Sequence, residues 1–154
     1  ASLLKYTQSN NEILVESVIS ILGEMQSSEI HDIAIMLLEN KGLDSLALGL
    51  LKKNYKKSDD DIIYSLIKKK SSISHHVQQD IGYIYMNHRS INAIPTLRNV
   101  YKKGICTFCR YRIIKAMNHC RVLSDEILEE CQYDSYEETR RFANRLIARR
   151  RKNN

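Results

Sequence analysis

The segment Asp80-Ile81-Gly82-Tyr83-Ile84-Tyr85-Met86-Asn87 decides the fold of this chain. A shift of 32 residues aligns it with Arg112-Ile113-Ile114-Lys115-Ala116-Met117-Asn118-His119, and apolar residues meet at three positions. A further shift of 30 brings Ala143, Leu146 and Ile147 to the same three positions. The apolar residues of each segment have helical spacing, so the chain repeats a helix at a period near 30 residues.

The repeat extends toward the N-terminus with one interruption. A shift of 48 residues aligns Asp32-Ile33-Ala34 with Asp80-Ile81-Gly82. The extra length matches one helix near residues 59–70 with its connections, which we interpret as an insertion. A period near 30 is typical of an α-solenoid, in which stacked helix pairs bury a continuous core. We therefore expect one all-α domain over residues 1–154, an α-solenoid of about eight or nine helices in antiparallel pairs.

Apolar periodicity and capping residues place the individual helices. The first is expected near 10–24, the second between Ser27-Ser28 and Lys41-Gly42, the third over Leu43–Leu51, and the fourth from Ser58 or Asp59 to Lys70. The later helices are expected at roughly 74–88, 91–103, 107–120, 124–132 and 136–151. The basic tail 149–154 is expected to fray.

The composition agrees with a helical chain. One proline and five glycines are too few for a loop-rich or all-β protein. No segment approaches the ~20 apolar residues of a membrane span, and Ala1-Ser2-Leu3-Leu4 shows no secretory signal. The four cysteines fall within 26 residues, inside helical patterns, so we expect reduced thiols and a cytoplasmic location.

The unit 77–103 also resembles a known repeat. Its second helix opens with Ile94-Pro95-Thr96-Leu97, which places proline in the first turn, and its first helix contains Gly82. The unit resembles HEAT-type repeats of the short variety found in phycobilisome-lyase-like proteins, and the resemblance implies that Gly82 is a close-packing point. This resemblance covers residues 74–150 and, more faintly, 28–53, and it implies a concave binding face lined by the second helix of each pair. Later units depart from it, because Ile114 replaces Gly82 and 124–131 lacks proline.

The cysteines and histidines suggest metal binding only at first sight. Cys106-x-x-Cys109 precedes His119-Cys120, but on one helix Cys109 and His119 lie ten residues and ~15 Å apart. We interpret Cys109 and Cys120 as core residues, because they share a helical stripe with Ile113, Ala116 and Met117; a redox dithiol is the further alternative. His75 and His76 point about 100° apart and are expected at the surface. No metal and no cofactor is predicted.

Catalytic motifs are absent from the sequence. The chain contains no HExxH motif, P-loop, GxGxxG motif or Ser/His/Asp order. The run Asp59-Asp60-Asp61 fits the first turn of a helix, where acidic residues interact favourably with the helix dipole. We therefore expect a binding protein and not an enzyme.

Charge is distributed unevenly along the chain. Residues 1–100 hold 11 basic and 11 acidic side chains, whereas residues 101–154 hold 13 and 7 and carry the whole net charge of +6. Within 101–154 an acidic run at 125–138 precedes an arginine-rich run at 140–152. Such separation favours a charged binding surface, although a single helix with acids at its start and bases at its end gives the same pattern.

The first functional hypothesis is a protein-binding module. By similarity of fold, the chain is similar to bacterial immunity proteins that neutralise secreted nuclease toxins, in which acidic residues occupy the phosphate-binding surface of a basic toxin. The predicted partner-binding residues are Asn92, Thr96, Asn99, Asp125, Glu126, Glu129, Glu130, Tyr133 and Asp134. The nine tyrosines against two phenylalanines suit an interface, or alternatively the boundary of the core.

The alternative hypothesis is nucleic-acid binding. Some HEAT-like proteins, including relatives of DNA glycosylases, hold DNA with a basic concave face. The residues that would form such a face here are Arg110, Arg112, Lys115, Arg121, Arg141 and Arg145. A membrane partner is not expected, because the apolar face of the terminal helix is small. Reversing the charges of Glu129 and Glu130 would separate the two hypotheses, since only a basic protein partner needs those acids.

Overall fold

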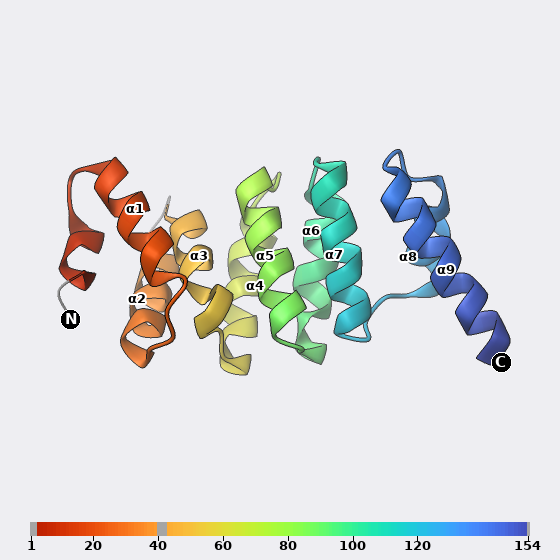
Figure 1. Cartoon of the computed structure of the whole chain (residues 1–154), viewed down its shortest axis with the longest axis horizontal. Coiled ribbons are helices and arrows are strands. Elements are labelled where there is room, and N and C mark those ends of the chain that lie inside the picture. The colour runs from red at the N-terminus through yellow and green to blue at the C-terminus, as the bar shows by residue number, and fades with distance from the viewer. Residues whose placement is uncertain (1–2, 40–42, 154) are drawn as a thin grey trace. The chain divides into compact units, whose positions relative to one another are not determined.

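The computed structural model describes residues 3–39 and 43–153, and its architecture over these residues is all-α (Figure 1). The helices are α1 (Glu12–Leu22), α2 (Ser28–Glu39), α3 (Asp44–Asn54), α4 (Asp60–Lys69), α5 (His75–Asn87), α6 (Ile94–Lys103), α7 (Thr107–His119), α8 (Asp125–Glu130) and α9 (Glu137–Asn153). Short 3-10 helices occur at η1 (Leu4–Gln8), η2 (Lys57–Asp59), η3 (Ile91–Ala93) and η4 (Cys131–Tyr133). Each expected helix is confirmed, and the predicted cap at Gly42 lies outside the described residues.

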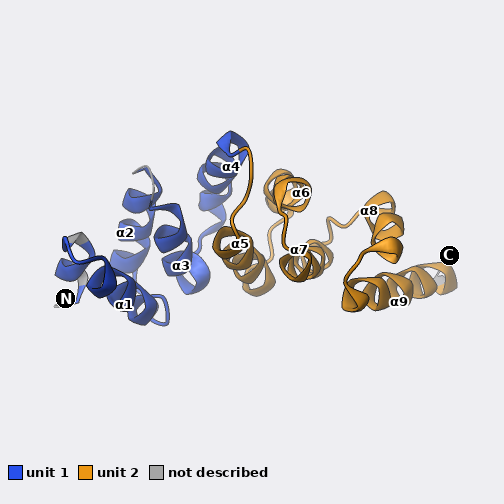
Figure 2. Ribbon diagram, turned by 90° about the horizontal axis from the view of Figure 1, so that it is seen from above, with its two compact units in different colours: residues 1–70 blue, residues 71–154 orange. Residues whose placement is uncertain are grey.

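The chain divides into two compact units, residues 1–70 and 71–154, where the repeat predicted one domain (Figure 2). Helix α4, interpreted from the sequence as an insertion, is the last helix of unit 1 and contacts α2 there. A continuous solenoid over both units stays a prediction. Of the helices in 3–39 and 43–153, none combines the length and the apolar character needed to cross a membrane.

Unit 1 is built on the packing of α2 against α3, with α1 also contacting α3. Its core contains the fully buried side chains of Leu48, Leu51 and Ile63. Asn54 connects the loop after α1 to the end of α3, because its side chain accepts from the Ser27 N–H at 2.9 Å and donates to the Met25 carbonyl at 2.9 Å. A buried amide with its partners in place holds this loop in one position.

A buried histidine joins α2 to the start of α4 in unit 1. His31 Nε2 lies 3.1 Å from both carboxylate oxygens of Asp59, and only 8% of His31 and 3% of Asp59 is exposed. The same carboxylate accepts the backbone N–H of Lys56 at 2.7 Å, and Lys56 Nζ lies 3.1 Å from His31 Nδ1. The Asp59 carboxylate therefore caps the turn that begins α4 and anchors it to α2.

Unit 2 is organised by the packing of α5 against α7, and α6, α8 and α9 also make contacts within this unit. Ser74 caps α5 by accepting the Val77 N–H, and Pro95 lies in the first turn of α6, as the sequence predicted. The predicted stripe on α7 is confirmed, because Cys109, Ile113, Ala116, Met117 and Cys120 are all at most 2% exposed. These cysteines contribute to the core as small apolar side chains.

Gly82 allows α5 and α7 to approach closely, as expected for a close-packing point. A β-carbon at this position would lie 2.7 Å from Cγ and 2.8 Å from Cδ of Arg112. Such a distance is shorter than any van der Waals contact between carbon atoms allows. The missing side chain of Gly82 therefore leaves the space through which Arg112 crosses the surface of α5.

The C-terminal helix continues further than the sequence suggested. Helix α9 extends to Asn153, so residues 149–153, which were expected to fray, are helical in this structure. Arg150 explains the difference, because its guanidinium pairs with Asp125 and donates to the Leu123 carbonyl at 3.1 Å. These contacts tie the last turns of α9 to the segment that begins α8, which the local sequence alone does not show.

Thr96 and Thr139 are two fully buried threonines of unit 2 whose hydroxyls have no hydrogen-bond partner among the described residues. A buried hydroxyl without a partner costs free energy, and valine has nearly the same shape. We expect Thr96→Val to raise the free energy of unfolding by about 1 kcal/mol, measured by urea denaturation. The same exchange at Thr139 should act in the same direction, and a loss of stability at both sites would contradict this account.

Candidate nucleic-acid interface

Helices α5, α7 and α9 form one layer of unit 2, and α6 and α8 form the other, as both views of the ribbon show (Figures 1 and 2). The layer of α5, α7 and α9 carries five of the six basic residues that the sequence proposed for nucleic acid, namely Arg110, Arg112, Lys115, Arg141 and Arg145. Unit 2 as a whole holds 15 Lys and Arg against 8 Asp and Glu, a net charge of +7. Its electrostatic potential therefore favours an anionic partner.

Aromatic side chains connect α7 to α9 across this layer. The rings of Phe108 and Tyr111 both meet Tyr136, with centroids 5.9 and 5.8 Å apart, and Tyr111 also meets Phe142 at 6.0 Å. All three contacts are edge-to-face, a geometry worth about 0.5–1.5 kcal/mol per pair beyond burial. Phe108 nevertheless remains 46% exposed, so part of this aromatic series faces solvent.

Two cations lie over the aromatic rings. The Arg112 guanidinium carbon is 4.0 Å from the centre of the Tyr83 ring on α5 and 5.7 Å from that of Phe108. Lys115 Nζ is 5.4 Å from the centre of the Tyr111 ring. Nη1 of Arg112 is buried and has no hydrogen-bond partner among the described residues, so contact of this guanidinium with a ligand goes through its other nitrogens.

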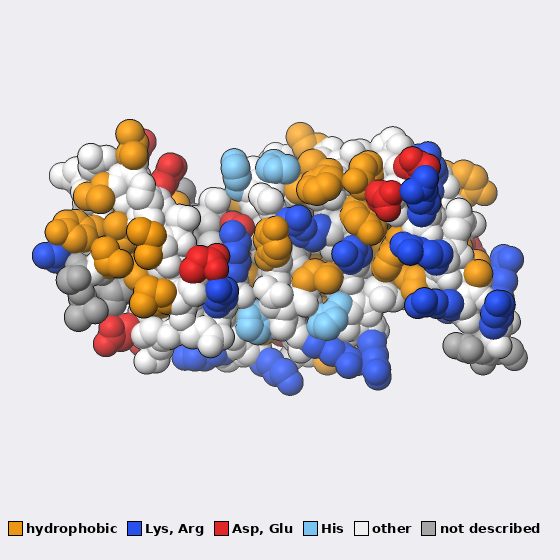
Figure 3. Space-filling view, viewed as in Figure 1, with side chains coloured by type: hydrophobic (Ala, Val, Ile, Leu, Met, Phe, Trp, Pro, Cys, Tyr) orange, Lys and Arg blue, Asp and Glu red, His pale blue; other side chains and the backbone are white. Residues whose placement is uncertain are grey.

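These side chains surround a groove of about 310 Å³ between α5 and α7. We call it the aromatic–cationic groove, and it is lined by Tyr83, Met86, Asn87, Phe108, Tyr111, Arg112 and Lys115. Tyr83 is 38% and Phe108 is 46% exposed, so both rings reach solvent beside the two cations. Figure 3 shows Lys and Arg side chains gathered beside hydrophobic ones on this face of unit 2.

The arginines of α9 extend the positive charge beyond the groove. Arg145 and Arg149 are exposed and follow one another at one-turn spacing, about 6 Å along the helix. Arg141, one turn earlier, forms ion pairs with Glu137 at 2.7 Å and with Glu138 at 3.3 Å. The predicted basic surface is therefore strongest around the groove and in the later turns of α9.

Two residues of the predicted basic surface, Arg110 on α7 and Arg121 just after it, lie outside the groove. Arg110 pairs with Asp134 at 3.2 Å, and its guanidinium lies 5.6 Å from the Tyr101 ring. Arg121 ends α7 in a left-handed conformation with φ of 61°, which lets the Val122 N–H donate to the Met117 carbonyl at 2.9 Å. Its side chain is exposed. Neither residue lines the aromatic–cationic groove.

Four of the nine predicted partner-binding residues are buried or hold contacts within the chain. Thr96 is fully buried and the Asp134 side chain is 2% exposed, so both are corrected as partner contacts. Asp134 accepts the Tyr136 N–H at 2.8 Å, which places it at the turn before α9. Asp125 pairs with Arg150, and the Asn99 amide donates to the Pro95 carbonyl at 2.9 Å.

The remaining members of that acidic site are at the surface, namely Asn92, Glu126, Glu129, Glu130 and Tyr133. Glu126 and Glu130 line a second groove of about 420 Å³, together with Arg98, Tyr101, Lys102, Arg110, Ser124 and Ile127. Burial raises the pKa of both nearby acid groups, that of the Tyr101 hydroxyl and that of the Cys131 thiol, the latter to about 11. Both groups stay protonated near neutral pH, so this mixed-charge groove gains no nucleophile from them.

Comparison with protein-family models, with curated proteins and with solved structures gives no match for this chain. The fold and the surface define the chain as an all-α protein whose unit 2 carries a basic face lined by aromatic residues.

Arg112 and Lys115 were predicted from the sequence, but their aromatic neighbours Tyr83, Phe108 and Tyr111 were not assigned to the same site. The excess of tyrosine was the available signal. It could not distinguish a surface ring from one at the edge of the core, because that depends on which helices pack together.

Proposed function

We propose that unit 2 binds single-stranded nucleic acid through the aromatic–cationic groove. The observation that carries this proposal is the position of Arg112, stacked on Tyr83 and close to Phe108 at the edge of a groove that also contains Lys115. Exposed rings stack on bases with about 1–3 kcal/mol per base, and cations attract the phosphates between them. Single strands present unstacked bases, which duplexes do not.

The internal neutralisation of the acidic run favours nucleic acid over a basic protein partner. Asp125 and Asp134 each pair with an arginine, and Glu137 and Glu138 share Arg141. The charges of Arg145 and Arg149 have no partner of this kind among the ion pairs of the described residues. The net positive charge of unit 2 would also repel a basic toxin.

A protein-binding function remains a second candidate because of one specific surface. Tyr133 is 87% exposed, and the exposed acids Glu129 and Glu130 precede it in the chain. An exposed tyrosine beside acids suits the central contact of an interface with a basic protein. The immunity hypothesis therefore rests on Tyr133 and these glutamates. Thr96 and Asp134 do not contribute to it, because both are buried.

The test of nucleic-acid binding is a salt titration with a matched pair of variants. Binding of a fluorescent oligonucleotide of about 12 nucleotides is followed by anisotropy between ~50 and ~200 mM salt. Arg112→Gln with Lys115→Gln should weaken binding about tenfold or more and lower the salt slope by ~1.4, because each lost phosphate contact in a single strand contributes about 0.7. A duplex of equal length should bind more weakly than the single strand.

The control removes the same charge from the other layer of unit 2. Arg98 and Lys102 are exposed residues of α6, outside the aromatic–cationic groove. Arg98→Gln with Lys102→Gln should change binding by no more than about threefold, since only the long-range field is altered. If both double variants lose the same affinity for the oligonucleotide, binding depends on net charge and not on the groove. Glu129→Lys with Glu130→Lys should leave or strengthen binding of the oligonucleotide, because both residues lie outside the groove and the change adds positive charge.

A further inference from the structure

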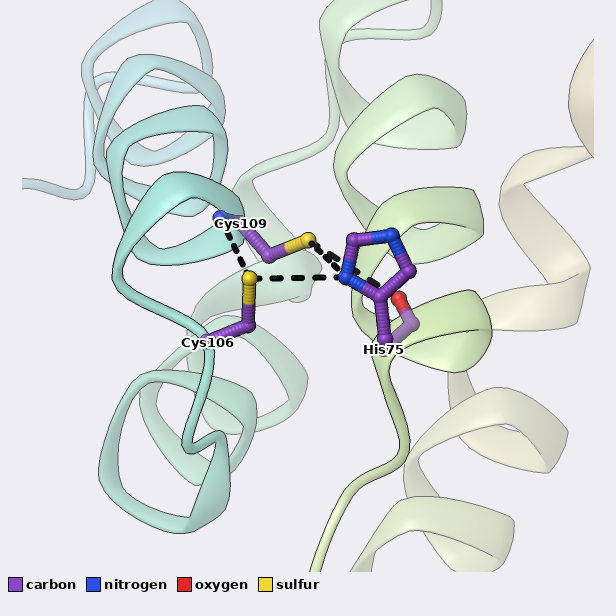
Figure 4. Close-up of side chains that lie close together, drawn as sticks. All are labelled: His75, Cys106 and Cys109. Atoms are coloured by element: carbon purple, nitrogen blue, oxygen red, sulfur yellow. Dashed lines mark hydrogen bonds between the residues drawn. The ribbon is translucent and has the colours of Figure 1, made fainter.

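His75, Cys106 and Cys109 bring three potential metal ligands together in unit 2 (Figure 4). His75 Nδ1 lies 3.4 Å from the Cys106 sulfur and 3.3 Å from the Cys109 sulfur. The three donor atoms all lie within 4.8 Å of one another. Two thiols and an imidazole thus converge at one point, although no metal site was predicted from the sequence.

The fold explains why these residues meet. Ile73 and Gly104 form an isolated parallel bridge, in which the Ile73 N–H donates to the Lys103 carbonyl at 3.4 Å. His75 follows Ile73 by two residues and Cys106 follows Gly104 by two, so equal steps along parallel segments place them side by side. Cys106 then caps α7 by accepting the Cys109 N–H at 3.5 Å, which turns Cys109 toward the same point.

We propose that His75, Cys106 and Cys109 bind a Zn²⁺ ion, with an exogenous ligand in the fourth position. Zinc bonds of about 2.3 Å to sulfur and 2.0–2.1 Å to nitrogen, at tetrahedral angles, imply S···N separations of about 3.6 Å. The two observed S···N distances, 3.3 and 3.4 Å, approach this value. Small rotations of the three side chains would bring their donor atoms to three corners of a tetrahedron around the ion.

The donor set selects the kind of cation. Thiolate sulfur and imidazole nitrogen suit zinc, whereas magnesium and calcium prefer oxygen ligands. Three protein ligands with one open position are typical of reactive or exchangeable zinc sites, while structural sites have four. The exposure of His75 and the partial exposure of Cys106 leave room for water or another ligand at that position. The proposal is independent of nucleic-acid binding.

The test uses the reduced full-length chain and metal alone. After removal of oxygen, the protein is titrated with Co²⁺, whose visible absorption reports tetrahedral thiolate coordination, and then with Zn²⁺ as competitor. We expect one ion per chain and displacement of cobalt by zinc. Cys106→Ser and His75→Gln should each weaken binding about 100-fold or more, since loss of an outer-shell partner alone costs 10- to 100-fold. Both positions are at least partly exposed, so these variants should fold.

His76→Gln is the matched control, because its ring is the exposed neighbour of His75 but is not one of the three ligands. The site is supported if His76→Gln keeps its metal affinity while Cys106→Ser and His75→Gln lose theirs. Affinity that is equal in all three variants overturns it. A reduced chain that takes up no cobalt, while air oxidation joins Cys106 to Cys109, would show a redox dithiol and would also overturn the zinc site.

Discussion

Replacement of His31 by alanine is expected to destabilise unit 1 by about 3 kcal/mol. The change leaves the Asp59 carboxylate 3% exposed and without the imidazole N–H that lies 3.1 Å from both its oxygens. A buried charge that loses its partner costs more than the pair contributes, because it is not rehydrated. The Lys56 N–H still donates to this carboxylate, so the turn before α4 is weakened but not abolished.

Hydrogen exchange measures this effect within unit 1 alone. Amides of α2 and α4 should exchange about 100-fold faster in His31→Ala, because 1.4 kcal/mol corresponds to a factor of ten. Asp32→Ala is the matched control, since Asp32 also contacts His31, at 3.3 Å, but its side chain is 75% exposed. It should change exchange by less than about threefold. Equal effects of the two variants would contradict the role given to the buried pair.

Replacement of Gly104 by alanine is expected to cost unit 2 about 2–3 kcal/mol. An added β-carbon would lie 2.7 Å from the Val100 carbonyl oxygen and 2.6 Å from Cδ of Gln78. The carbonyl cannot move without breaking the hydrogen bond that it accepts from the Gly104 N–H at 2.9 Å. Gln78 is also fixed, because it is 1% exposed and donates to the Ile73 carbonyl at 3.0 Å.

Urea denaturation of the full chain gives the size of this loss, and a second glycine provides the control. A β-carbon at Gly49 on α3 would meet only Ile19 Cγ2 at 3.9 Å, an ordinary contact. Gly49→Ala should therefore be neutral or stabilising by up to about 1 kcal/mol, because alanine favours the helix. Cobalt binding by Gly104→Ala should weaken as well, since Gly104 pairs with Ile73 in the bridge that aligns His75 with Cys106. A stable Gly104→Ala protein would show that this bridge tolerates displacement.

The two proposed sites differ in how much of them the sequence could predict. Arg112 and Lys115 were predicted because charge is visible in a sequence, and their spacing places them on one helix. His75 was interpreted as a surface residue and Cys109 as a core residue. The structure agrees with both, because His75 is exposed and Cys109 is fully buried. Their contact was missed because 34 residues separate them. The packing of α5 against α7 and the bridge between Ile73 and Gly104 bring the two segments together.

The acidic run shows that charge in a sequence does not reveal which residues pair with one another. Seven acids at 125–138 indicated a binding surface, yet Asp125 and Asp134 pair with Arg150 and Arg110 inside unit 2. Sequence separation hides such pairs, because an arginine 25 residues away looks independent until α8 contacts α9. Charge that is neutralised within the chain contributes little to a partner.

The sequence by itself determined the helices, their apolar stripes and the basic character of residues 101–154. Each of these depends on local spacing or on composition, which can be read along the chain. Only the tertiary structure decided that the chain divides at residue 70, which acids remain free, and that Tyr83 meets Arg112 while His75 meets Cys109. These outcomes depend on how helices pack, and packing brings together residues whose separation in sequence carries no signal of their contact.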